Sequence, residues 1–195
     1  MMLPLPYTWP VCIPYWLAYG WAYLAEVRRI PGMRGSVVPE MDKGSLKVIL
    51  WTIALANIGA FAFAGFLPAM AMTAVLPAYV AGILLIISGG LLRRHCFAML
   101  GRRFTYAVNA MPDQTVVETG VYRFIRHPSY LAGLIKFAGI GLGLGNWASF
   151  ALCIVLPALA YGYRIPVEER ALIQTIGPAY EDYTKRTSRL IPFVL

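Results

Sequence analysis

The chain has 195 residues, of which 59% are hydrophobic and only 13% are charged. Soluble domains have about 45–50% apolar and about 25% charged residues, so this composition excludes a cytosolic globule, a disordered tail and a disulfide scaffold. It indicates a polytopic membrane protein with room for about five spans. The net charge of +8 would suggest nucleic acid as a partner in a soluble protein, so the positions of the charges have to be considered next.

Five apolar stretches reach, or nearly reach, the length of about 20 residues that a helix needs to cross the hydrocarbon. They cover residues 9–27, 46–67, 74–92, 130–145 and 147–163. The last two are short, because a helix of about 16 residues rises only about 24 Å. Only Asn146 separates them, which predicts a tight helical hairpin. No Lys or Arg precedes Arg28, so we expect the first stretch to be a retained span and not a signal peptide.

The charged residues gather between or after these stretches, in segments 26–47, 93–126 and from 164 onwards. The loops 68–73 and 145–147 carry no charge, and all of the 17 Lys and Arg residues except Lys136 fall on one side. The positive-inside rule places that side in the cytoplasm, with the N-terminus outside and the C-terminus inside. The positive charge is therefore mainly a consequence of topology, and no nucleic-acid partner is predicted.

Small residues recur at helical spacing and predict close helix packing. They are Ala56, Ala60 and Ala64 in one stretch, and Gly139, Gly141, Gly143 and Gly145 in another. The glycine spacing is not that of a dinucleotide-binding loop, and no strand precedes it. The three cysteines are far apart and outside any CxxC spacing, so neither a metal site nor a disulfide is predicted.

The segment 93–127 and the tail from residue 164 together form a cap over the last two spans, too small for a Rossmann domain. We therefore predict an all-α integral membrane protein with five transmembrane helices, a small cytoplasmic cofactor-binding cap and no Rossmann domain. Residues 1–92 would form an N-terminal three-helix membrane region. Residues 93–195 would form the catalytic region, with a cytoplasmic loop, the helical hairpin 130–163 and an amphipathic tail.

The densest polar cluster covers residues 122–130. Pro128 suits the first position of a helix and moves His127 out of the α region, so the fourth span is predicted to begin at about Pro128. The positive end of this helix would face the interface, where an anionic group could dock between His127, Ser129 and Tyr130. The residues alone are equally compatible with simple anchoring at the membrane interface.

A second cluster covers residues 164–170. Pro166 is expected to stop or kink the fifth span just after Arg164. Glu168 follows Arg164 by four residues, so both would face one ligand if the helix restarts. Arg164 is either a fixed cation for an acidic substrate group or a snorkelling residue of the positive-inside type.

The remaining cytoplasmic segments carry weaker signals. The loop 28–47 is rich in Pro and Gly and looks irregular, with basic residues facing the headgroups. The tail predicts one short helix over 167–176 and a second opened by Pro178, which lies on the membrane or folds back as a lid. His95 is interpreted as interfacial, and Lys136 either snorkels or points into the site.

Taken together, these clusters resemble the isoprenylcysteine carboxyl methyltransferase family and the related phospholipid methyltransferases, in their prokaryotic integral-membrane form. The resemblance covers residues 114–192, whereas the first three spans match in topology alone. The residues that carry it are Gln114–Val117, Gly120–Tyr122, Arg126–Tyr130, Arg164, Glu168, Glu169, Leu172, Gly177, Tyr180, Tyr183 and Arg189–Pro192.

The resemblance implies a small all-α membrane enzyme that uses S-adenosyl-L-methionine and releases S-adenosyl-L-homocysteine. It implies that Arg164 faces the substrate. Glu169 is a second candidate catalytic residue. The cofactor contacts that it implies are Gln114, Thr115, Val116, Val117, Tyr122, His127, Pro128, Ser129, Tyr130 and Glu168.

The expected activity is methyl transfer to a lipid-like acceptor in the membrane, foremost the carboxylate of a prenylated cysteine, whether small molecule or protein. Three alternatives stay open. The first is N-methylation of a phospholipid amine, for which Glu169 or His127 would be the base. The second is an NADPH-dependent reductase of the sterol type, with Arg102, Arg103 and Arg123 as cations for the 2′-phosphate. The third is a non-catalytic membrane scaffold or transporter.

Overall fold

The computed structural model describes residues 4–27, 39–101 and 115–191, and these residues form helices and loops without a strand. The predicted all-α class is therefore confirmed for the part of the chain described. Gln114, a predicted site residue, lies outside it. The helices are α1 (Cys12–Val27), α2 (Pro39–Asp42), α3 (Ser45–Phe66), α4 (Val75–Leu100), α5 (Pro128–Gly143), α6 (Trp147–Ile176) and α7 (Pro178–Arg186), with 3-10 turns η1 (Leu5–Tyr7), η3 (Pro68–Met70) and η5 (Gly120–Arg123).

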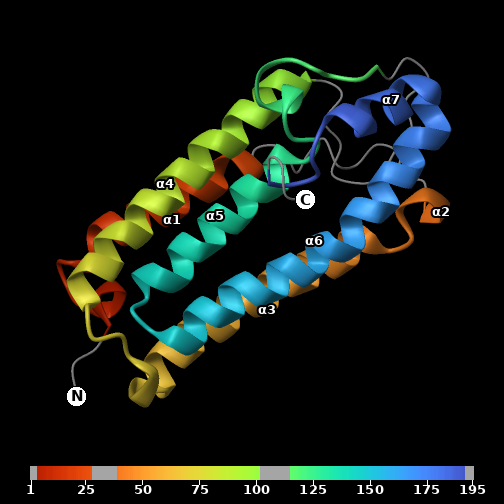
Figure 1. Ribbon diagram of the computed structural model, residues 1–195. Coiled ribbons are helices and arrows are strands. Elements are labelled where there is room, and N and C mark those ends of the chain that lie inside the picture. Colours follow the sequence, from red (N-terminus) through yellow and green to blue (C-terminus); the bar gives the residue numbers. More distant parts are fainter. Residues whose placement is uncertain (1–3, 28–38, 102–114, 192–195) are drawn as a thin grey trace.

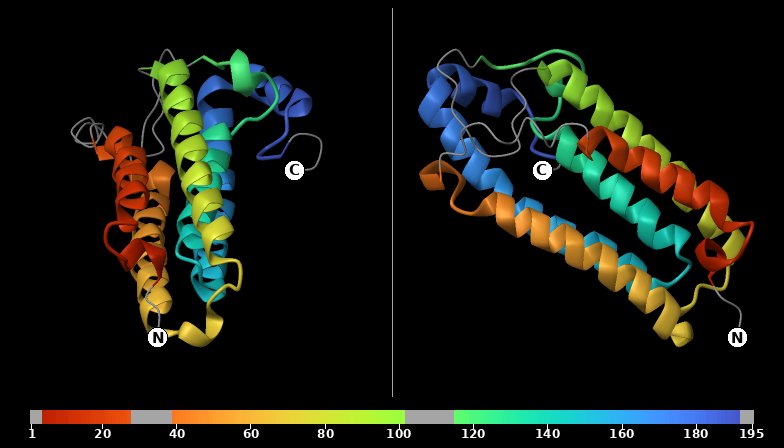
Figure 2. Two further views of the ribbon diagram at one scale, coloured as in Figure 1. Left: turned by 90° about the vertical axis from the view of Figure 1, so that its left-hand side faces the viewer. Right: turned by 180° about the vertical axis from the view of Figure 1, so that it is seen from behind.

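The axes of the long helices are roughly aligned, with α3 and α5 running opposite to α1, α4 and α6, as Figures 1 and 2 show. Helices α3 and α6 lie side by side, while α4 packs against α5 and α1. The short helices α2 and α7 and the turn η5 gather at one end of the bundle. The described parts of the segments that the sequence predicts to be cytoplasmic therefore lie at one end of the bundle.

The two charge-free loops meet at the opposite end of the bundle. The backbone N–H of Met72 donates to the carbonyl of Gly145 at 2.8 Å, and the Asn146 side chain donates to the carbonyl of Leu67 at 2.8 Å. Asn146 also caps α6 by accepting from the backbone N–H of Ser149 at 3.1 Å. The predicted hairpin of α5 and α6 is confirmed, and its turn is bonded to the turn between α3 and α4.

Small residues bring the helices close together, as their spacing predicted. Ala56, Ala60 and Ala64 are buried on α3, and the Ser149 hydroxyl of α6 donates to the carbonyl of Ala60 at 2.6 Å. Between α4 and α5 the backbones themselves touch: a Cβ added at Gly139 would lie 2.6 Å from the carbonyl oxygen of Gly82. The glycines on α5 are therefore packing residues.

Within the described part of the chain, three helices are long and apolar enough to cross a membrane: α3, α4 and α6. The first and fourth predicted spans also form helices, α1 and α5, but each has only 16 residues. The structure thus supports an integral membrane protein and three of the five predicted spans by length and composition.

Of the stop or kink predicted at Pro166, the stop is wrong. Helix α6 runs unbroken for 30 residues through both Pro157 and Pro166, so no separate helix begins at residue 167. A proline inside a helix removes one hydrogen bond and costs about 3 kcal/mol. Tertiary contacts of Arg164 and Glu169, on either side of Pro166, offset this cost by fixing the last turns of α6 against other elements.

Helix α4 extends beyond the predicted end of the third span at residue 92 and continues to Leu100. Its extra turns are held to α1 by two arginines. Arg93 Nε donates to Glu26 at 2.9 Å, and Arg94 donates to the carbonyl of Trp21 at 2.6 Å while lying over the Trp21 ring. The predicted boundary between two regions at residues 92 and 93 therefore falls inside one continuous helix.

Candidate active site

The segment that leads into α5 is paired with the segment that follows α7. Helix α5 begins at Pro128, with His127 before it, as the sequence predicted. The backbone N–H of Arg126 donates to the carbonyl of Ser188 at 2.8 Å, and that of His127 donates to the carbonyl of Arg189 at 3.0 Å. Two polar motifs about sixty residues apart in the chain are therefore neighbours in space.

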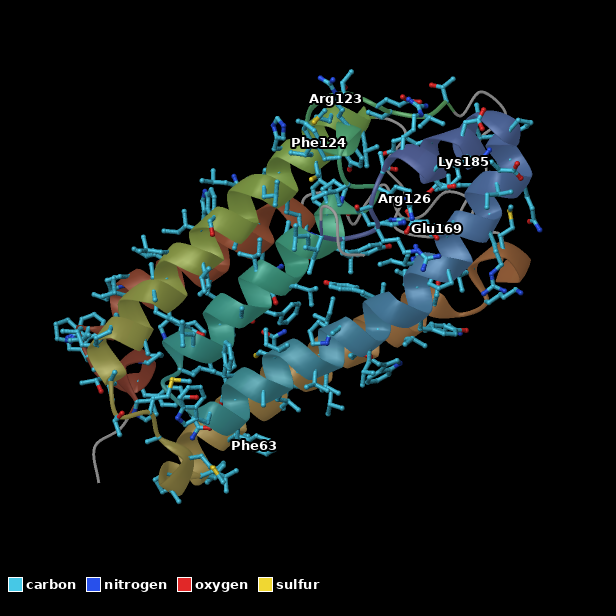
Figure 3. The ribbon with its side chains drawn as sticks, viewed as in Figure 1. Phe63, Arg123, Phe124, Arg126, Glu169 and Lys185 are labelled. Atoms are coloured by element: carbon cyan, nitrogen blue, oxygen red, sulfur yellow. The ribbon has the colours of Figure 1, made fainter. Side chains whose placement is uncertain are left out.

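Glu169 on α6 joins these two segments. Its Oε1 accepts from Arg126 Nε at 2.9 Å and lies 3.3 Å from His127 Nε2, and its Oε2 accepts from Arg189 Nε at 3.1 Å. Figure 3 shows Arg126 and Glu169 close together at the end of the bundle away from Phe63. Both carboxylate oxygens are thus engaged, which gives Glu169 an anchoring position between α6 and the two motif segments.

Helix α7 packs against this region through several hydrogen bonds. Tyr183 donates its hydroxyl proton to the carbonyl of Tyr122 at 2.6 Å, and Arg126 donates to the carbonyls of Thr184, at 2.9 Å, and Thr187. Burial raises the pKa of Tyr183 to about 12, so its hydroxyl keeps its proton at neutral pH. The tail therefore forms part of the cap.

The second polar centre surrounds Arg164, which is only 2% exposed. Its Nη1 donates to the carboxylate of Asp42 and to the Ser45 hydroxyl, the latter at 2.5 Å. Its Nε donates to the Tyr130 hydroxyl at 3.3 Å and lies 3.9 Å from Glu168 Oε2. Because α6 is continuous, Arg164 and Glu168 lie on one face, as their spacing predicted.

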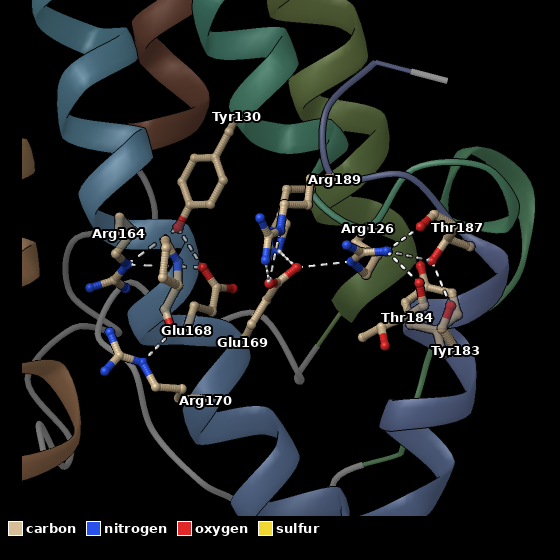
Figure 4. Close-up of polar contacts among 12 residues, drawn as sticks. Arg126, Tyr130, Arg164, Glu168, Glu169, Arg170, Tyr183, Thr184, Thr187 and Arg189 are labelled. Carbon is tan, nitrogen blue, oxygen red and sulfur yellow. Dashed lines mark hydrogen bonds and ion pairs between the residues drawn. The ribbon is translucent and has the colours of Figure 1, made fainter. Parts of the chain in front are cut away.

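Tyr130 connects the two residues of α6 with α5. Its hydroxyl donates to Glu168 Oε2 at 2.6 Å while it accepts from Arg164. Figure 4 shows Tyr130, Arg164 and Glu168 grouped together, with Glu169, Arg126 and Arg189 beside them. The structure therefore brings together five of the predicted site residues: His127, Tyr130, Arg164, Glu168 and Glu169.

Asp42 and Ser45 are members of this centre that the sequence analysis did not identify. Asp42 is 3% exposed, and its Oδ2 accepts from the backbone N–H of Leu46 in the first turn of α3 at 3.0 Å. The loop that contains it was interpreted as irregular, with its basic residues at the headgroups. An aspartate followed closely by an apolar helix is a common helix-start pattern and was the available signal.

The other predicted cofactor residues that the structure describes differ in burial and in contacts. Thr115 is exposed and Val116 and Val117 are half-buried before η5; no hydrogen bond or ion pair joins them to Arg164 within the described ranges. Pro128 is buried, and the Ser129 carbonyl accepts from Arg93 at 2.8 Å. Pro128 and Ser129 thus lie between His127 and Tyr130 at the start of α5.

Tyr122 differs from the other tyrosines of the cap. It is 5% exposed, and its hydroxyl lies near the Cys96 thiol, with no stronger hydrogen-bond partner among the residues that the structure describes. Burial, together with this thiol, holds the pKa of the phenol above its ordinary value, so the hydroxyl stays protonated. A thiol is a weak hydrogen-bonding group, so a ligand can bond to this hydroxyl at little cost.

Lys136, the cation that departed from the charge pattern, belongs to a separate buried network. Its Nζ donates to Glu26 at 2.6 Å, and Arg93 Nε donates to the same carboxylate oxygen at 2.9 Å. The ammonium group also lies 3.9 Å from the centre of the Tyr23 ring. Lys136 thus ties α5 to α1 and α4.

The fold defines this protein as a helical membrane protein whose polar residues gather in a cap at one end. The solved structure of the eukaryotic intramembrane Ras methyltransferase ICMT shares this fold, with a TM-score of 0.64 over 94% of this chain and 63% of that chain. The sequence identity is 21%, so this comparison concerns the fold alone.

The phospholipid methyltransferase family model matches residues 77–178, more than half of the chain, and the chain belongs to that family. It is 35% identical over 115 residues to protein-S-isoprenylcysteine O-methyltransferase B of Arabidopsis thaliana, and 34% identical over 117 residues to the protein-S-isoprenylcysteine O-methyltransferase of Saccharomyces cerevisiae. These matches span 58% and 49% of the relatives' lengths.

Proposed function

We propose that the chain is an S-adenosylmethionine-dependent methyltransferase that methylates the carboxylate of a prenylated cysteine, or an analogue of it, at the membrane surface. The observation that carries this proposal is the position of Arg164. It is a buried guanidinium on a helix long enough to span the membrane, directly at the level of the polar cap. A fixed guanidinium suits a carboxylate brought in on a lipid.

The residues around Arg164 and Tyr122 fit the proposed cofactor, which supplies an electrophilic methyl group when bound. Glu168 has a side chain about one third exposed, with one oxygen bonded to Tyr130, and its charge suits a sulfonium or ammonium group. The start of α5 at Pro128 suits a carboxylate, because helix N-termini favour anions. The buried Tyr122 hydroxyl offers one more hydrogen bond.

The protein's own part in this reaction is to position and desolvate the acceptor. A carboxylate is already ionised at pH 7, so the reaction needs no general base. Arg164 orients the acceptor, and the burial of Arg164 and the packing of Tyr130 between α5 and α6 keep water from the nucleophile. Glu169 and His127 hold the cap together.

The proposal includes the topology expected from the charges, with five spans, the N-terminus outside and a cytoplasmic site. Helices α1 and α5 have only 16 residues each, so they can cross the bilayer only where it is thinned. Maleimide labelling of single cysteines introduced at Met70 and Lys185, in sealed cells and after permeabilisation, tests the orientation. Labelling of the Lys185 position in sealed cells would contradict it.

A purified sample tests the activity. The protein in detergent is incubated with S-adenosylmethionine and either an N-acetylated S-prenylcysteine or phosphatidylethanolamine, and methyl incorporation into each is measured. Calorimetry with S-adenosylhomocysteine measures cofactor binding separately. We expect binding and an ester product with the prenylcysteine. Cofactor binding without transfer to either acceptor would contradict the proposed acceptor class, and no binding would contradict a methyltransferase.

One observation favours N-methylation of a phospholipid amine as a second candidate. Asp42 and Glu168 both lie at Arg164, and two carboxylates at one centre suit a cation. The phosphatidylethanolamine arm of the experiment addresses this candidate. The family and the relatives are methyltransferases, which favours methyl transfer over the reductase and scaffold alternatives.

A further inference from the structure

Asp42 occupies the position at Arg164 that an acceptor carboxylate would need. Arg164 Nη1 donates to Asp42 Oδ1 and to the Ser45 hydroxyl. Both charged residues are buried, with Arg164 2% exposed and Asp42 3% exposed. The partner of the guanidinium is therefore a carboxylate from α2, brought to α6 from 122 residues away in the sequence. It is chemically the same group as the proposed substrate's.

The charges at this centre oppose binding of the acceptor carboxylate to the Arg164 guanidinium while Asp42 is still bound there. Asp42 and Glu168 already place two negative charges at one guanidinium. Two like charges about 4 Å apart repel by about 1 kcal/mol in water and by several times more at a buried site. A lipid-borne carboxylate can therefore bind Arg164 well if Asp42 gives up its contact.

The geometry of Asp42 allows this exchange without unfolding its surroundings. Its two oxygens have separate roles, because Oδ2 holds the N–H of Leu46 at 3.0 Å while Oδ1 faces Arg164 and the Ser45 hydroxyl. Helix α2 is also docked independently of this ion pair, since Met41 packs against Val167 and Ala171 of α6. Oδ1 can leave Arg164 while α2 and the start of α3 stay in place.

We propose that Asp42 is an exchangeable counter-ion of Arg164, an inference that rests on the carboxyl methylation proposed above. The acceptor carboxylate replaces Asp42 on the guanidinium when it binds. Methylation forms a bond from a carboxylate oxygen to the methyl carbon, breaks the bond from that carbon to the donor sulfur, which keeps the electron pair, and releases no proton. Because the ester is neutral, it no longer forms an ion pair with Arg164. Asp42 binds the guanidinium again, which favours release of the product.

Neutral variants at position 42 test the exchange. Asp42→Asn and Asp42→Ser keep an oxygen that can accept from Leu46, yet they remove the competing charge. Binding of an N-acetylated S-prenylcysteine and of its methyl ester is measured by calorimetry in the presence of S-adenosylhomocysteine. We expect the acid to bind about tenfold more tightly in both variants than in the wild type, and the ester to change by less than about threefold.

Glu181→Gln is the control, because it neutralises a carboxylate at an exposed position on α7 that is not part of this ion pair. Its ratio of acid to ester affinity should equal that of the wild type within about twofold. Equal or weaker binding of the acid in the neutral variants overturns the exchange, and so does an absence of acid binding in all of these proteins. Production of the methyl ester by the wild type is measured separately. If the acid binds more tightly in the neutral variants but the wild type makes no ester, the proposed activity is contradicted and the exchange is not.

A measurement on the wild type covers the case in which the variants do not fold, because removing one partner of a buried ion pair is destabilising. Hydrogen–deuterium exchange is followed on the peptide that contains residues 39–46, with the acid or the ester bound. Release of Asp42 predicts at least about twofold faster exchange of this peptide in the acid complex. The same exchange rate in both complexes overturns the proposal.

Discussion

Arg126 and Glu169 form a buried ion pair, with Nε and Oε1 2.9 Å apart, that joins the segment before α5 to the last turns of α6. Arg189 contacts the other oxygen of the same carboxylate at 3.1 Å. One side chain therefore holds three segments of the cap together.

Replacing Glu169 with Gln should loosen the cap, because it leaves Arg126 without its carboxylate partner. Loss of one partner from a buried pair costs about 3–5 kcal/mol. We expect a clear fall in the thermal unfolding midpoint, measured in detergent by light scattering and intrinsic fluorescence. Glu181→Gln, at an exposed position on α7, is the control and should leave the midpoint unchanged. Similar midpoints for the two variants would argue against the anchoring role.

Replacing Arg164 with Ala should separate acceptor handling from cofactor binding. We expect turnover of a prenylcysteine to fall by at least about 100-fold, since the variant loses the fixed cation that orients the acceptor. The affinity for S-adenosylhomocysteine, measured by calorimetry, should stay within about threefold of the wild type. Arg164→Lys keeps the charge without the planar donor set and should recover only part of the rate. A parallel loss of cofactor affinity would contradict the assigned role.

Adding one methyl group at Gly139 should push α4 and α5 apart. A Cβ there would lie 2.6 Å from the carbonyl oxygen of Gly82 and 2.6 Å from the backbone nitrogen of Ile86, neither of which can move alone. Gly139→Ala is expected to destabilise the protein by about 1–3 kcal/mol. Gly65→Ala is the control, because a Cβ at that helical position meets nothing within 4 Å. A stable Gly139→Ala protein would mean that the α4–α5 contact is looser than described.

Neutralising Glu26 should destabilise the protein, because Lys136 and Arg93 are buried beside its carboxylate. Glu26→Gln leaves Lys136 and Arg93 close together in a buried position, and we expect a loss of about 3–5 kcal/mol in stability. Adding Lys136→Met to this variant should restore part of the loss, because the second change removes one of the cations that lost its partner. Chemical denaturation of the wild type, of each single variant and of the double variant measures this coupling. Purely additive effects would indicate that the pair does not interact in solution.

The features that the sequence predicted correctly depend on local rules. Pro128 marks the first turn of α5, Asn146 marks the turn of the hairpin, and four residues separate Arg164 from Glu168 on one helix face. Each of these follows from proline geometry, helix capping or helical periodicity, and needs no knowledge of the partner helices.

The features that were missed depend on which helices meet. Asp42 reaches Arg164 across 122 positions, and Glu26 reaches Lys136 across 110. No local pattern links residues so far apart. Tertiary contacts of Arg164 and Glu169 explain why the predicted stop at Pro166 is wrong, because a helix end fixed by partners on other elements tolerates a proline that an isolated helix would not.

The hydrogen bonds between Met72 and Gly145 and between Asn146 and Leu67 fasten the bundle at the end away from the cap. These two bonds satisfy the N–H of Met72, the side-chain amide of Asn146 and the carbonyls of Gly145 and Leu67, so these groups need no water at that end. They also fix the turn between α3 and α4 against the turn between α5 and α6. If α6 and α3 swing away from α5 to admit a lipid chain, the displacement grows with distance from this fixed point and is greatest beside Arg164.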